Sequence, residues 1–349
     1  MMDHMTSVGS ITALPVVDLR DNPDLLRNGL REAAHEVGFF YLTGHEVPVP
    51  LVGKVLEAAR RLFELPQADK DAIAMVHSPH FRGYTRMGGE LTRGEVDWRE
   101  QIDIGPQRRP IGVPGKPDYL WLQGPNQWPA ALPELPGVIA EWDAVLSGVA
   151  RTLLRHWAVS LGSPADVFDG AFAEAPATLI KVIRYPDRAV TSQGVGAHKD
   201  SGVLTLLLAE PGSRGLQVRP PDSPDWLDVP PLPGAFVVNI GELLEVATGG
   251  YLRATEHRVS LRESAAERIS VAYFFNPRLD AQIPLLSLPG ELAAHGAARV
   301  EDPSDPIFSV YGRNAWKSRL RAHPDVAAAH GYAPGRLESE NPVLGSRGE

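Results

Sequence analysis

The chain of 349 residues contains no cysteine. This absence excludes a disulfide framework, thiolate-held iron–sulfur clusters and haem, a cysteine nucleophile and cysteine-ligated zinc. Any metal held by the protein must therefore bind nitrogen and oxygen atoms, which 11 histidines and 43 acidic residues can supply. A chain of this size buries roughly three quarters of its unfolded surface, so it needs neither disulfides nor a structural metal to fold.

Positive charge and long apolar runs are also scarce. The 34 basic and 43 acidic residues give a net charge of −9, which argues against a nucleic-acid partner because phosphate binding requires clustered lysine and arginine. No stretch approaches ~18 consecutive apolar residues, so we expect no membrane span. Residues 1–10 show neither the basic nor the apolar segment of a secretory signal, and we therefore expect a cytoplasmic enzyme.

The N-terminal half of the chain has the pattern that is typical of helices. Apolar residues recur at helical spacing over 22–37, 49–63 and 138–161. Pro23 suits the first turn of the first of these helices. Residues 77–136 differ, because they are rich in glycine, proline and arginine and show little periodicity. A segment of this length without periodicity is unusual inside a compact domain, so we expect an ordered functional loop.

From residue 177 the pattern changes to short apolar runs divided by glycine and proline turns. The expected strands cover 177–185, 194–198, 203–209, 215–219, 235–240, 251–259 and 268–275. About seven closely spaced strands without helical spacers predict an antiparallel sandwich or a jelly roll. The helices of the N-terminal half and the extreme C-terminus should pack outside this β core.

One pair of metal-ligand residues lies within the expected β core. His198 and Asp200 are two residues apart, so on a strand they would point to the same face and could share one metal ion. The spacing alone carries little information, because His323 and Asp325 repeat it. That second pair encloses a proline and has basic neighbours, so we expect it to form a surface turn that ends a helix.

The first pair is followed by three further residues with matching chemistry. His257 lies near the end of a later expected strand, and Arg268 and Ser270 share one face of the next. Two histidines and one carboxylate can hold one face of a divalent ion and leave the opposite face open. An arginine that points into an apolar barrel is costly without an anion, so Arg268 and Ser270 could bind the distal carboxylate of a dicarboxylate chelator.

This constellation resembles the non-haem Fe(II)/2-oxoglutarate-dependent dioxygenases of the isopenicillin N synthase-like family. The resemblance covers nearly the whole chain, and the flanking segments that match in order are 14–19, 38–42, 124–129, 215–218, 238–242 and 311–312. It implies a mainly β fold, with a double-stranded β-helix (jelly-roll) core supported by N-terminal helices and a C-terminal helical segment. This fold agrees with the expected strands.

The resemblance also implies roles for individual residues. His198, Asp200 and His257 would be the iron ligands and so the catalytic centre. Arg268 and Ser270 would bind the C5 carboxylate of 2-oxoglutarate, whose keto-acid end would chelate the iron.

Further contacts to 2-oxoglutarate are implied by the segment 181–186. Tyr185 would donate a hydrogen bond to the co-substrate. Ile183 stands where the family often has asparagine, so one polar contact is missing. Lys181 should face the same side as Tyr185 and could supply the lost interaction.

A substrate-side loop is implied by the segment 81–90. Its residues Arg82, Tyr84 and Glu90 are the candidate substrate contacts, and Glu90 would suit a cationic or amine-bearing substrate. A solvated loop without a role in binding is the alternative. The identity of the primary substrate is not visible in the sequence.

The reaction implied by the resemblance uses O2 and decarboxylates 2-oxoglutarate to succinate, with ascorbate as a candidate reductant. A ferryl species would then hydroxylate, desaturate or cyclise a small-molecule substrate, plausibly in specialised metabolism. The alternatives are an iron oxidase that needs no 2-oxoglutarate, and a jelly-roll metal isomerase or binding module, which would leave Arg268 and Ser270 unexplained. A monomer is compatible with the sequence, although no feature of it defines the oligomeric state.

The resemblance divides the chain into four parts. Residues 13–130 would be the N-terminal dioxygenase region with its helices and substrate-side loop, and 131–176 a long supporting helix with a connector. Residues 177–280 would form the jelly-roll core that holds iron and 2-oxoglutarate. Residues 281–349 would be a C-terminal extension.

Overall fold

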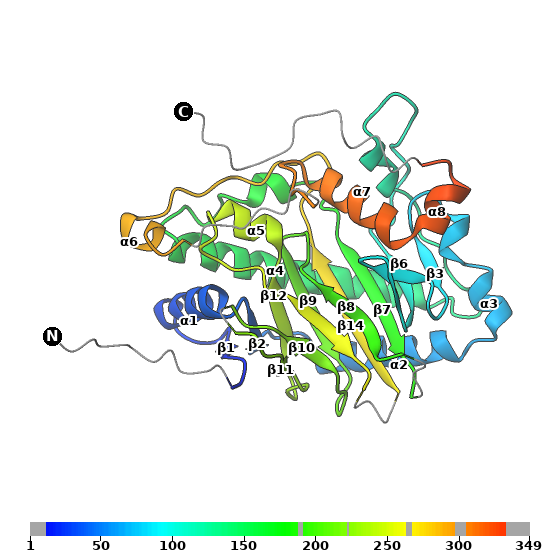
Figure 1. The fold of residues 1–349 in the computed structure, drawn as a ribbon, viewed down its shortest axis with the longest axis horizontal. Coiled ribbons are helices and arrows are strands. Elements are labelled where there is room, and N and C mark those ends of the chain that lie inside the picture. Colours follow the sequence, from blue (N-terminus) through cyan, green and yellow to red (C-terminus); the bar gives the residue numbers. More distant parts are fainter. Residues whose placement is uncertain (1–11, 188–190, 222, 263–266, 297–304, 333–349) are drawn as a thin grey trace.

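A computed structural model describes the chain over residues 12–187, 191–221, 223–262, 267–296 and 305–332. Two β-sheets form the centre of the molecule, and helices cover one outer face (Figure 1). None of the helices in the described ranges is both long and apolar enough to cross a membrane.

The larger sheet has eight strands in the order β1-β2-β12-β9-β14-β7-β6-β3. Their bounds are Val16–Asp18 (β1), Phe39–Thr43 (β2), Phe236–Ile240 (β12), Leu204–Ala209 (β9), Arg268–Phe275 (β14), Leu179–Tyr185 (β7), Glu100–Ile104 (β6) and Gly83–Thr85 (β3). Only β1 and β2 pair in parallel, and every other pair is antiparallel. The central strands β12 and β9 are mostly buried apolar residues because both faces of the sheet are covered.

The smaller sheet has four strands in the order β11-β10-β13-β8. They are Leu227–Asp228 (β11), Leu216–Val218 (β10), His257–Ser260 (β13) and Gln193–His198 (β8). A separate hairpin of β4 (Glu90–Thr92) and β5 (Glu95–Asp97) lies beside β8. Side chains of the two sheets form one buried apolar cluster that includes Tyr185, Val195 and Val259. The predicted jelly-roll core with flanking helices is confirmed.

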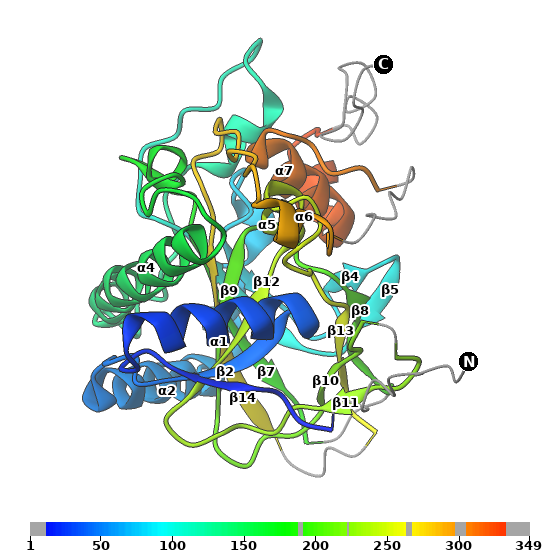
Figure 2. The ribbon, with the colours of Figure 1, turned by 90° about the vertical axis from the view of Figure 1, so that its left-hand side faces the viewer.

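Three long helices, α1 (Pro23–Glu36), α2 (Val49–Glu64) and α4 (Leu135–Ser160), pack on the outer face of the larger sheet (Figure 2). Asn22 caps α1, because its Oδ1 accepts a hydrogen bond from the Leu25 amide at 3.1 Å, and Pro23 occupies the first turn. The buried stripe of α4 includes Trp142 and Trp157, whose indole Nε1 donates to the Leu30 carbonyl at 3.0 Å. This layer braces the sheet from outside and leaves the space between the two sheets for a site.

The described residues also form eight shorter helices. They are α3 (Gln67–Asp71), η1 (Met75–His77), η2 (Asp118–Leu122), η3 (Asp169–Phe172), α5 (Glu242–Ala247), α6 (Gly290–Ala293), α7 (Tyr311–Ala322) and α8 (Pro324–Ala329).

The strand expected over 251–259 is wrong in its first six residues. Gly249 and Gly250 have φ of 60° and 80°, and the chain after this turn bonds to helices. The Arg253 amide donates to the Ala34 carbonyl of α1, so it is not available to a neighbouring strand. The strand β13 begins only at the second histidine, His257.

The expectation of one irregular loop over 77–136 is also wrong. This segment contains β3, β4, β5 and β6, and β6 and β3 extend the larger sheet. All five residues of β6 are buried, including Glu100, Gln101 and Asp103. A strand that buries polar side chains on both faces shows no alternation of apolar and polar residues, and alternation is the signal from which strands are predicted.

Candidate active site

His198 and His257 are brought together by the smaller sheet. They are direct partners in the antiparallel pairing of β8 with β13, and their ring centroids lie 4.3 Å apart. Asp200 lies just beyond the end of β8, and its Oδ1 is 3.6 Å from His198 Nε2 and 3.8 Å from His257 Nε2. One ligand atom from each of the three lies within 4.8 Å of the others. We call these residues the His–Asp–His cluster.

Both imidazoles are oriented by backbone carbonyls. His198 Nδ1 donates to the Gly196 carbonyl at 2.8 Å, and His257 Nδ1 donates to the Thr255 carbonyl at 3.1 Å. Because a carbonyl only accepts hydrogen bonds, each ring carries a proton on Nδ1. The Nε2 atoms are therefore the ones left to face Asp200 and a metal ion.

Asp200 is held in a matching way. Its Oδ2 accepts hydrogen bonds from Thr205 Oγ1 at 2.6 Å and from Asn239 Nδ2 at 2.8 Å, so its Oδ1 is the atom nearest the two histidines. Burial tends to raise the pKa of Asp200, but the neighbouring His198 and His257 outweigh it and hold this pKa below its usual range. The residue is therefore a carboxylate at neutral pH.

The charge of His257 is also compatible with binding of a metal cation by the cluster. Burial, together with the neighbouring His198, lowers the pKa of His257 to about 4, so this imidazole is neutral and able to coordinate. Two imidazoles and one carboxylate are a donor set for Fe(II) and related divalent ions, and they leave several coordination positions open.

A buried cation lies in the same cavity. Arg268, the first residue of β14, is 2% exposed and pairs in register with Tyr185 of β7, whose ring its guanidinium overlies at 4.7 Å. Its Nη1 donates to the Arg214 carbonyl, and its buried Nε has no partner among the described residues. Burial lowers the pKa of Arg268, because no carboxylate of the described chain balances its charge. Ser270 follows on the same strand face.

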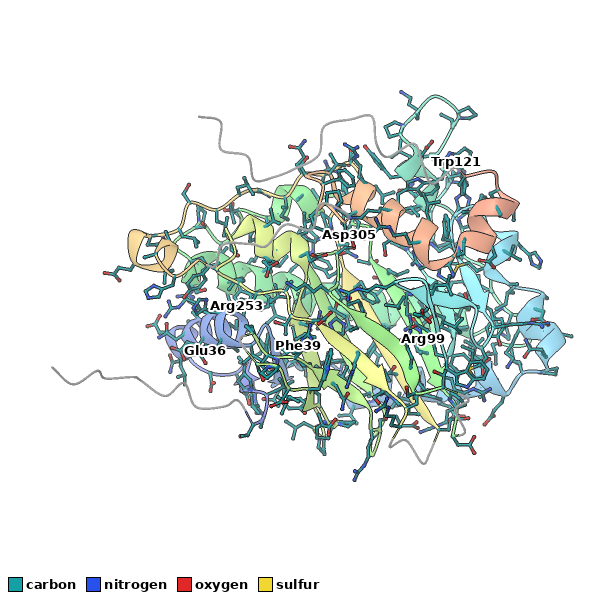
Figure 3. All side chains as sticks on the ribbon, viewed as in Figure 1. Glu36, Phe39, Arg99, Trp121, Arg253 and Asp305 are labelled. Carbon is teal, nitrogen blue, oxygen red and sulfur yellow. The ribbon has the colours of Figure 1, made fainter. Side chains whose placement is uncertain are left out.

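The cavity that contains these groups has a volume of about 900 Å³. Strands of both sheets, the β4–β5 hairpin and α7 contribute to its wall. Phe39, at the start of β2, lies between the sheets and packs edge-on against His257, with ring centroids 5.1 Å apart (Figure 3). The cavity is large enough for 2-oxoglutarate and a second small molecule together.

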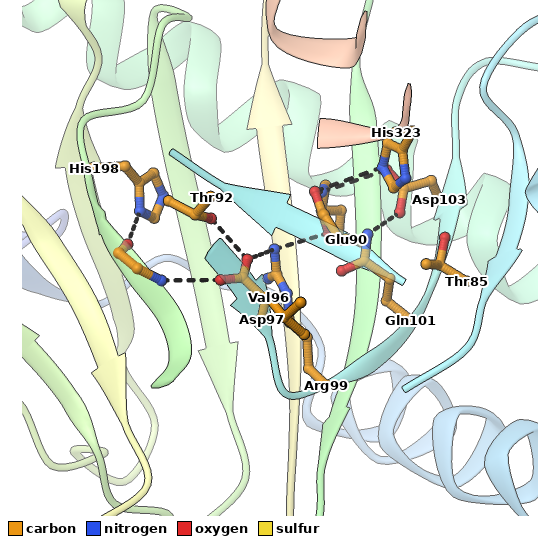
Figure 4. Close-up of polar contacts among 12 residues, drawn as sticks. Thr85, Glu90, Thr92, Val96, Asp97, Arg99, Gln101, Asp103, His198 and His323 are labelled. Carbon is orange, nitrogen blue, oxygen red and sulfur yellow. Dashed lines mark hydrogen bonds and ion pairs between the residues drawn. The ribbon is translucent and has the colours of Figure 1, made fainter. Parts of the chain in front are cut away.

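Lys181 and Glu90 lie on another wall of the cavity and form an ion pair. Lys181 Nζ donates to Glu90 Oε1 at 2.6 Å, and Arg99 Nη2 donates to Glu90 Oε2 at 2.9 Å. Figure 4 shows Arg99 between Glu90 and Asp97 on the hairpin side of the site. Glu90 thus already has two cationic partners in this structure.

The other two candidate substrate contacts lie elsewhere. The Tyr84 hydroxyl donates to the Glu100 carboxylate, and Arg82 Nη2 donates to the Leu122 carbonyl at 3.0 Å. Neither side chain lines the cavity of the His–Asp–His cluster.

The expectation that His323 lies in a surface turn is wrong. The residue joins α7 to α8 but is only 1% exposed, and its Nε2 lies 3.6 Å from Glu90 Oε1 (Figure 4). It takes no part in the His–Asp–His cluster.

The sequence interpretation also missed Thr205, whose hydroxyl donates to Asp200. A single polar residue in the apolar strand β9 was a signal that a polar group lies opposite.

Comparison with known families agrees with this geometry. Residues 14–131 match the family described as the non-haem dioxygenase in morphine synthesis N-terminal region, and residues 177–277 match the 2OG-Fe(II) oxygenase superfamily. The chain is 33% identical over 343 residues to the 2-oxoglutarate-dependent dioxygenase frbJ of Dothideomycetidae sp. (strain 11243), covering 91% of each chain. The chain belongs to the 2OG-Fe(II) oxygenase superfamily.

Other relatives extend this comparison. The oxygenase is 33% identical over 301 residues to homoarginine-6-hydroxylase 2-ODD-C23 of Glycine max, with 81% of this chain and 89% of the relative covered. It superposes on the crystal structure of JOX2 in complex with 2OG, Fe and JA with a TM-score of 0.67 and 26% identity, covering 91% of this chain and 89% of the other.

These relationships confirm the predicted family, enzyme class and co-substrates. The oxygenase is a non-haem iron enzyme that uses Fe(II) and 2-oxoglutarate. Its activity is therefore a 2-oxoglutarate-dependent oxygenation.

Proposed function

We propose that His198, Asp200 and His257 hold the Fe(II) of this oxygenase. The support for this assignment is the convergence of their three donor atoms, with both Nδ1 protons bound to carbonyls and Asp200 Oδ2 bound by two donors. Iron bound there supplies, with O2 and 2-oxoglutarate, the oxidising power for an unactivated C–H bond. The protein's part is to present the donors and to leave the opposite face of the ion open.

We propose that Arg268, Ser270 and Tyr185 bind the distal carboxylate of 2-oxoglutarate. Arg268 supplies the charge and a planar pair of donors, which suits a carboxylate. Tyr185 lies against the guanidinium and limits its orientation. Lys181 lines the same cavity, but its Nζ lies on Glu90, so a direct role in binding 2-oxoglutarate would require it to leave that carboxylate.

The proposal rests mainly on one observation: the His–Asp–His cluster shares its cavity with a buried arginine, Arg268, that has no carboxylate partner among the described residues. We propose a small-molecule substrate, because the cavity holds about 900 Å³. Cytoplasmic location, a monomer and the four-part division of the chain remain part of the same proposal. Of the three candidate substrate contacts, only Glu90 lines the cavity.

Anaerobic titration with Fe(II) and 2-oxoglutarate tests the proposed function. A chelated keto acid should give a weak visible charge-transfer band, and admission of O2 should release succinate. Absence of both signals would overturn the proposal. Turnover of a second substrate without 2-oxoglutarate would instead establish an iron oxidase that takes all electrons from its substrate or from ascorbate.

A further inference from the structure

A second, smaller cavity of about 50 Å³ lies against the cavity of the His–Asp–His cluster. Three guanidinium groups line it, from Arg82, Arg108 and Arg319, and no carboxylate is among its lining residues. The residues that line both cavities are Leu179, Tyr311, Ala315 and Arg319. The small cavity is therefore positively charged and adjoins the active-site cavity at these four residues, and we call it the arginine pocket.

Arg82 and Arg319 are equally buried, each 8% exposed, but only Arg319 of these two is paired with a carboxylate among the described residues. The Nη2 of Arg82 donates to the Leu122 carbonyl, and its buried Nε has no partner among the described residues. Burial, helped by the positive charge of Arg319 and opposed by Asp103, lowers the pKa of Arg82 to about 10. No carboxylate of the described residues is bonded to this guanidinium, and a buried charge without such a partner is costly.

The two other arginines add positive charge to the pocket and bring no spare carboxylate to it. Arg108 Nη1 donates to the Pro176 carbonyl at 2.9 Å, and burial lowers the pKa of this arginine as well. Arg319 is paired with Asp103, a carboxylate that also lies 3.6 Å from Lys181 Nζ. One acid thus already serves two cations, and the arginine pocket retains excess positive charge.

The backbone beside Arg82 is shaped to accommodate the guanidinium. A Cβ atom built on Gly105 would lie 2.2 Å from Arg82 Cζ, so only glycine leaves the space that the guanidinium fills. Asn126 fixes this glycine from the other side, because its Oδ1 accepts from the Gly105 amide and its Nδ2 donates to the Gly105 carbonyl. The position of Arg82 is therefore built into the fold.

We propose that the arginine pocket binds a carboxylate of the second substrate, with Arg82 as the principal cation, and that the rest of this organic acid extends into the larger cavity. This proposal rests on the proposed function, which places the oxidised carbon at the His–Asp–His cluster. A single water needs roughly 10–15 Å³ of such a cavity, so the pocket admits a group of a few heavy atoms and excludes a ring. A planar carboxylate matches the paired donors of a guanidinium.

The test uses the full chain loaded with Zn(II) and saturating 2-oxoglutarate, so that the His–Asp–His cluster and Arg268 are occupied. Calorimetry then compares acetate, hexanoate and phenylacetate with acetamide, hexanamide and phenylacetamide at constant ionic strength. We expect at least one acid to bind about tenfold or more tightly than its amide, as loss of a charge-assisted hydrogen bond implies. If no acid binds more tightly than its amide, the proposal is overturned.

Variants then assign the preference to the pocket. Arg82→Gln removes the charge, and Gly105→Ala displaces the guanidinium without removing it; each should abolish the preference for the acid. Arg108→Gln lies at the less buried edge of the arginine pocket and should weaken the preference for the acid. This variant tests the assignment if Arg82→Gln and Gly105→Ala fail to fold. The matched control is Arg109→Gln, because Arg109 is the exposed neighbour of Arg108 and does not line the pocket. A preference that survives in Arg82→Gln and Arg108→Gln overturns the assignment.

Two further measurements are needed. The first distinguishes an organic acid from a free inorganic anion, and the second distinguishes failure of the arginine-pocket proposal from failure of the proposed function. Inorganic phosphate is titrated under the same conditions, and binding of phosphate without binding of any organic acid would assign the pocket to a free anion and overturn the substrate role. Succinate release from Fe(II), 2-oxoglutarate and O2 without a second substrate tests the proposed function alone. Normal succinate release with no acid preference would therefore reject the arginine pocket and leave the proposed function intact.

Discussion

His198 and His257 face each other directly across the β8–β13 pair, with their ring centroids 4.3 Å apart. The described residues between them form four strands and a helix, so the contact depends on the whole jelly roll and not on a local motif. Each ring is fixed by a carbonyl of its own strand or the residues just before it. The three proposed metal ligands are therefore brought together by the tertiary fold and not by a local sequence motif.

The first prediction concerns His257. His257→Ala removes one of three donors, so the affinity for Co(II), used as an air-stable probe in calorimetry, should fall by more than the ~100-fold typical of losing an outer partner. Succinate release should disappear with it. His295→Ala is the control, because His295 is an exposed imidazole of the same type. Full oxygen consumption by His257→Ala would contradict the ligand assignment.

The second prediction concerns the residues that hold Asp200. Asn239→Ala and Thr205→Val each remove one hydrogen bond to Oδ2 and should weaken metal affinity by about 10–100-fold without abolishing it. High metal concentration should restore most of kcat, which distinguishes positioning from loss of a ligand. Thr152→Val, on the exposed face of α4, is the matched control. Unchanged metal affinity in both variants would show that Asp200 needs no support.

The third prediction concerns Arg268. Arg268→Gln should raise KM for 2-oxoglutarate about tenfold or more, since a charge-assisted contact to the distal carboxylate is lost. Metal affinity should not change. 2-Oxobutyrate, which lacks that carboxylate, should be used equally by the wild type and the variant. If Arg268→Gln impairs both keto acids alike, the arginine has a structural role only.

The His–Asp–His cluster and Arg268 are the part of the candidate site that could be predicted from the sequence. That His198, Asp200 and His257 lie together could be predicted from their residue types and the family resemblance, although the spacing of the first two alone carried little information. Arg268 could be singled out because an arginine in an apolar strand needs an anion. The strands of the core were predictable for a similar reason, since their apolar runs are interrupted by turns.

The polar region beside the site could not be predicted in the same way. Glu100, Gln101 and Asp103 are buried in β6, and their partners come from distant elements, such as Arg319 of α7 and Lys70 of α3. From the sequence alone each of these residues is expected at the surface. A charged side chain is buried only beside a partner, and here the partner is brought near only by the fold. The same reasoning explains why His323 was expected at the surface.

The fourth prediction concerns Lys181. Lys181→Met leaves Glu90 and Asp103 with fewer cationic partners in a buried setting, so the free energy of unfolding should fall by about 3–5 kcal/mol. Urea unfolding measures this loss. KM for 2-oxoglutarate should change little, and the double variant Lys181→Met/Glu90→Gln should recover part of the stability. A large rise in KM with unchanged stability would give Lys181 a role in binding the co-substrate instead.

The last prediction concerns the dependence of stability on pH through His323. Burial lowers the pKa of His323 to about 4, although the charges of Glu90 and Asp103 oppose this shift and those of Arg319 and Lys181 support it. In the unfolded chain the imidazole titrates near 6.5, so between these two values the unfolded state binds more protons than the folded state. The contribution of His323 to the free energy of unfolding should be fully present above pH 6.5 and should fall as the pH decreases towards 4.

The slope of this loss should reach at most about 1.4 kcal/mol per pH unit from His323. Glu90 stays ionised in this range, because the charges of Arg99 and Lys181 outweigh its burial and hold its pKa well below the usual value. Urea unfolding at pH 7.5, 6.0 and 5.0 measures the slope, and His323→Gln should remove the part that comes from this residue. His295→Gln changes an exposed histidine and should leave the slope as it is. An identical slope in the wild type and His323→Gln would mean that His323 is already protonated in the folded state, as an ion pair with Glu90 would require.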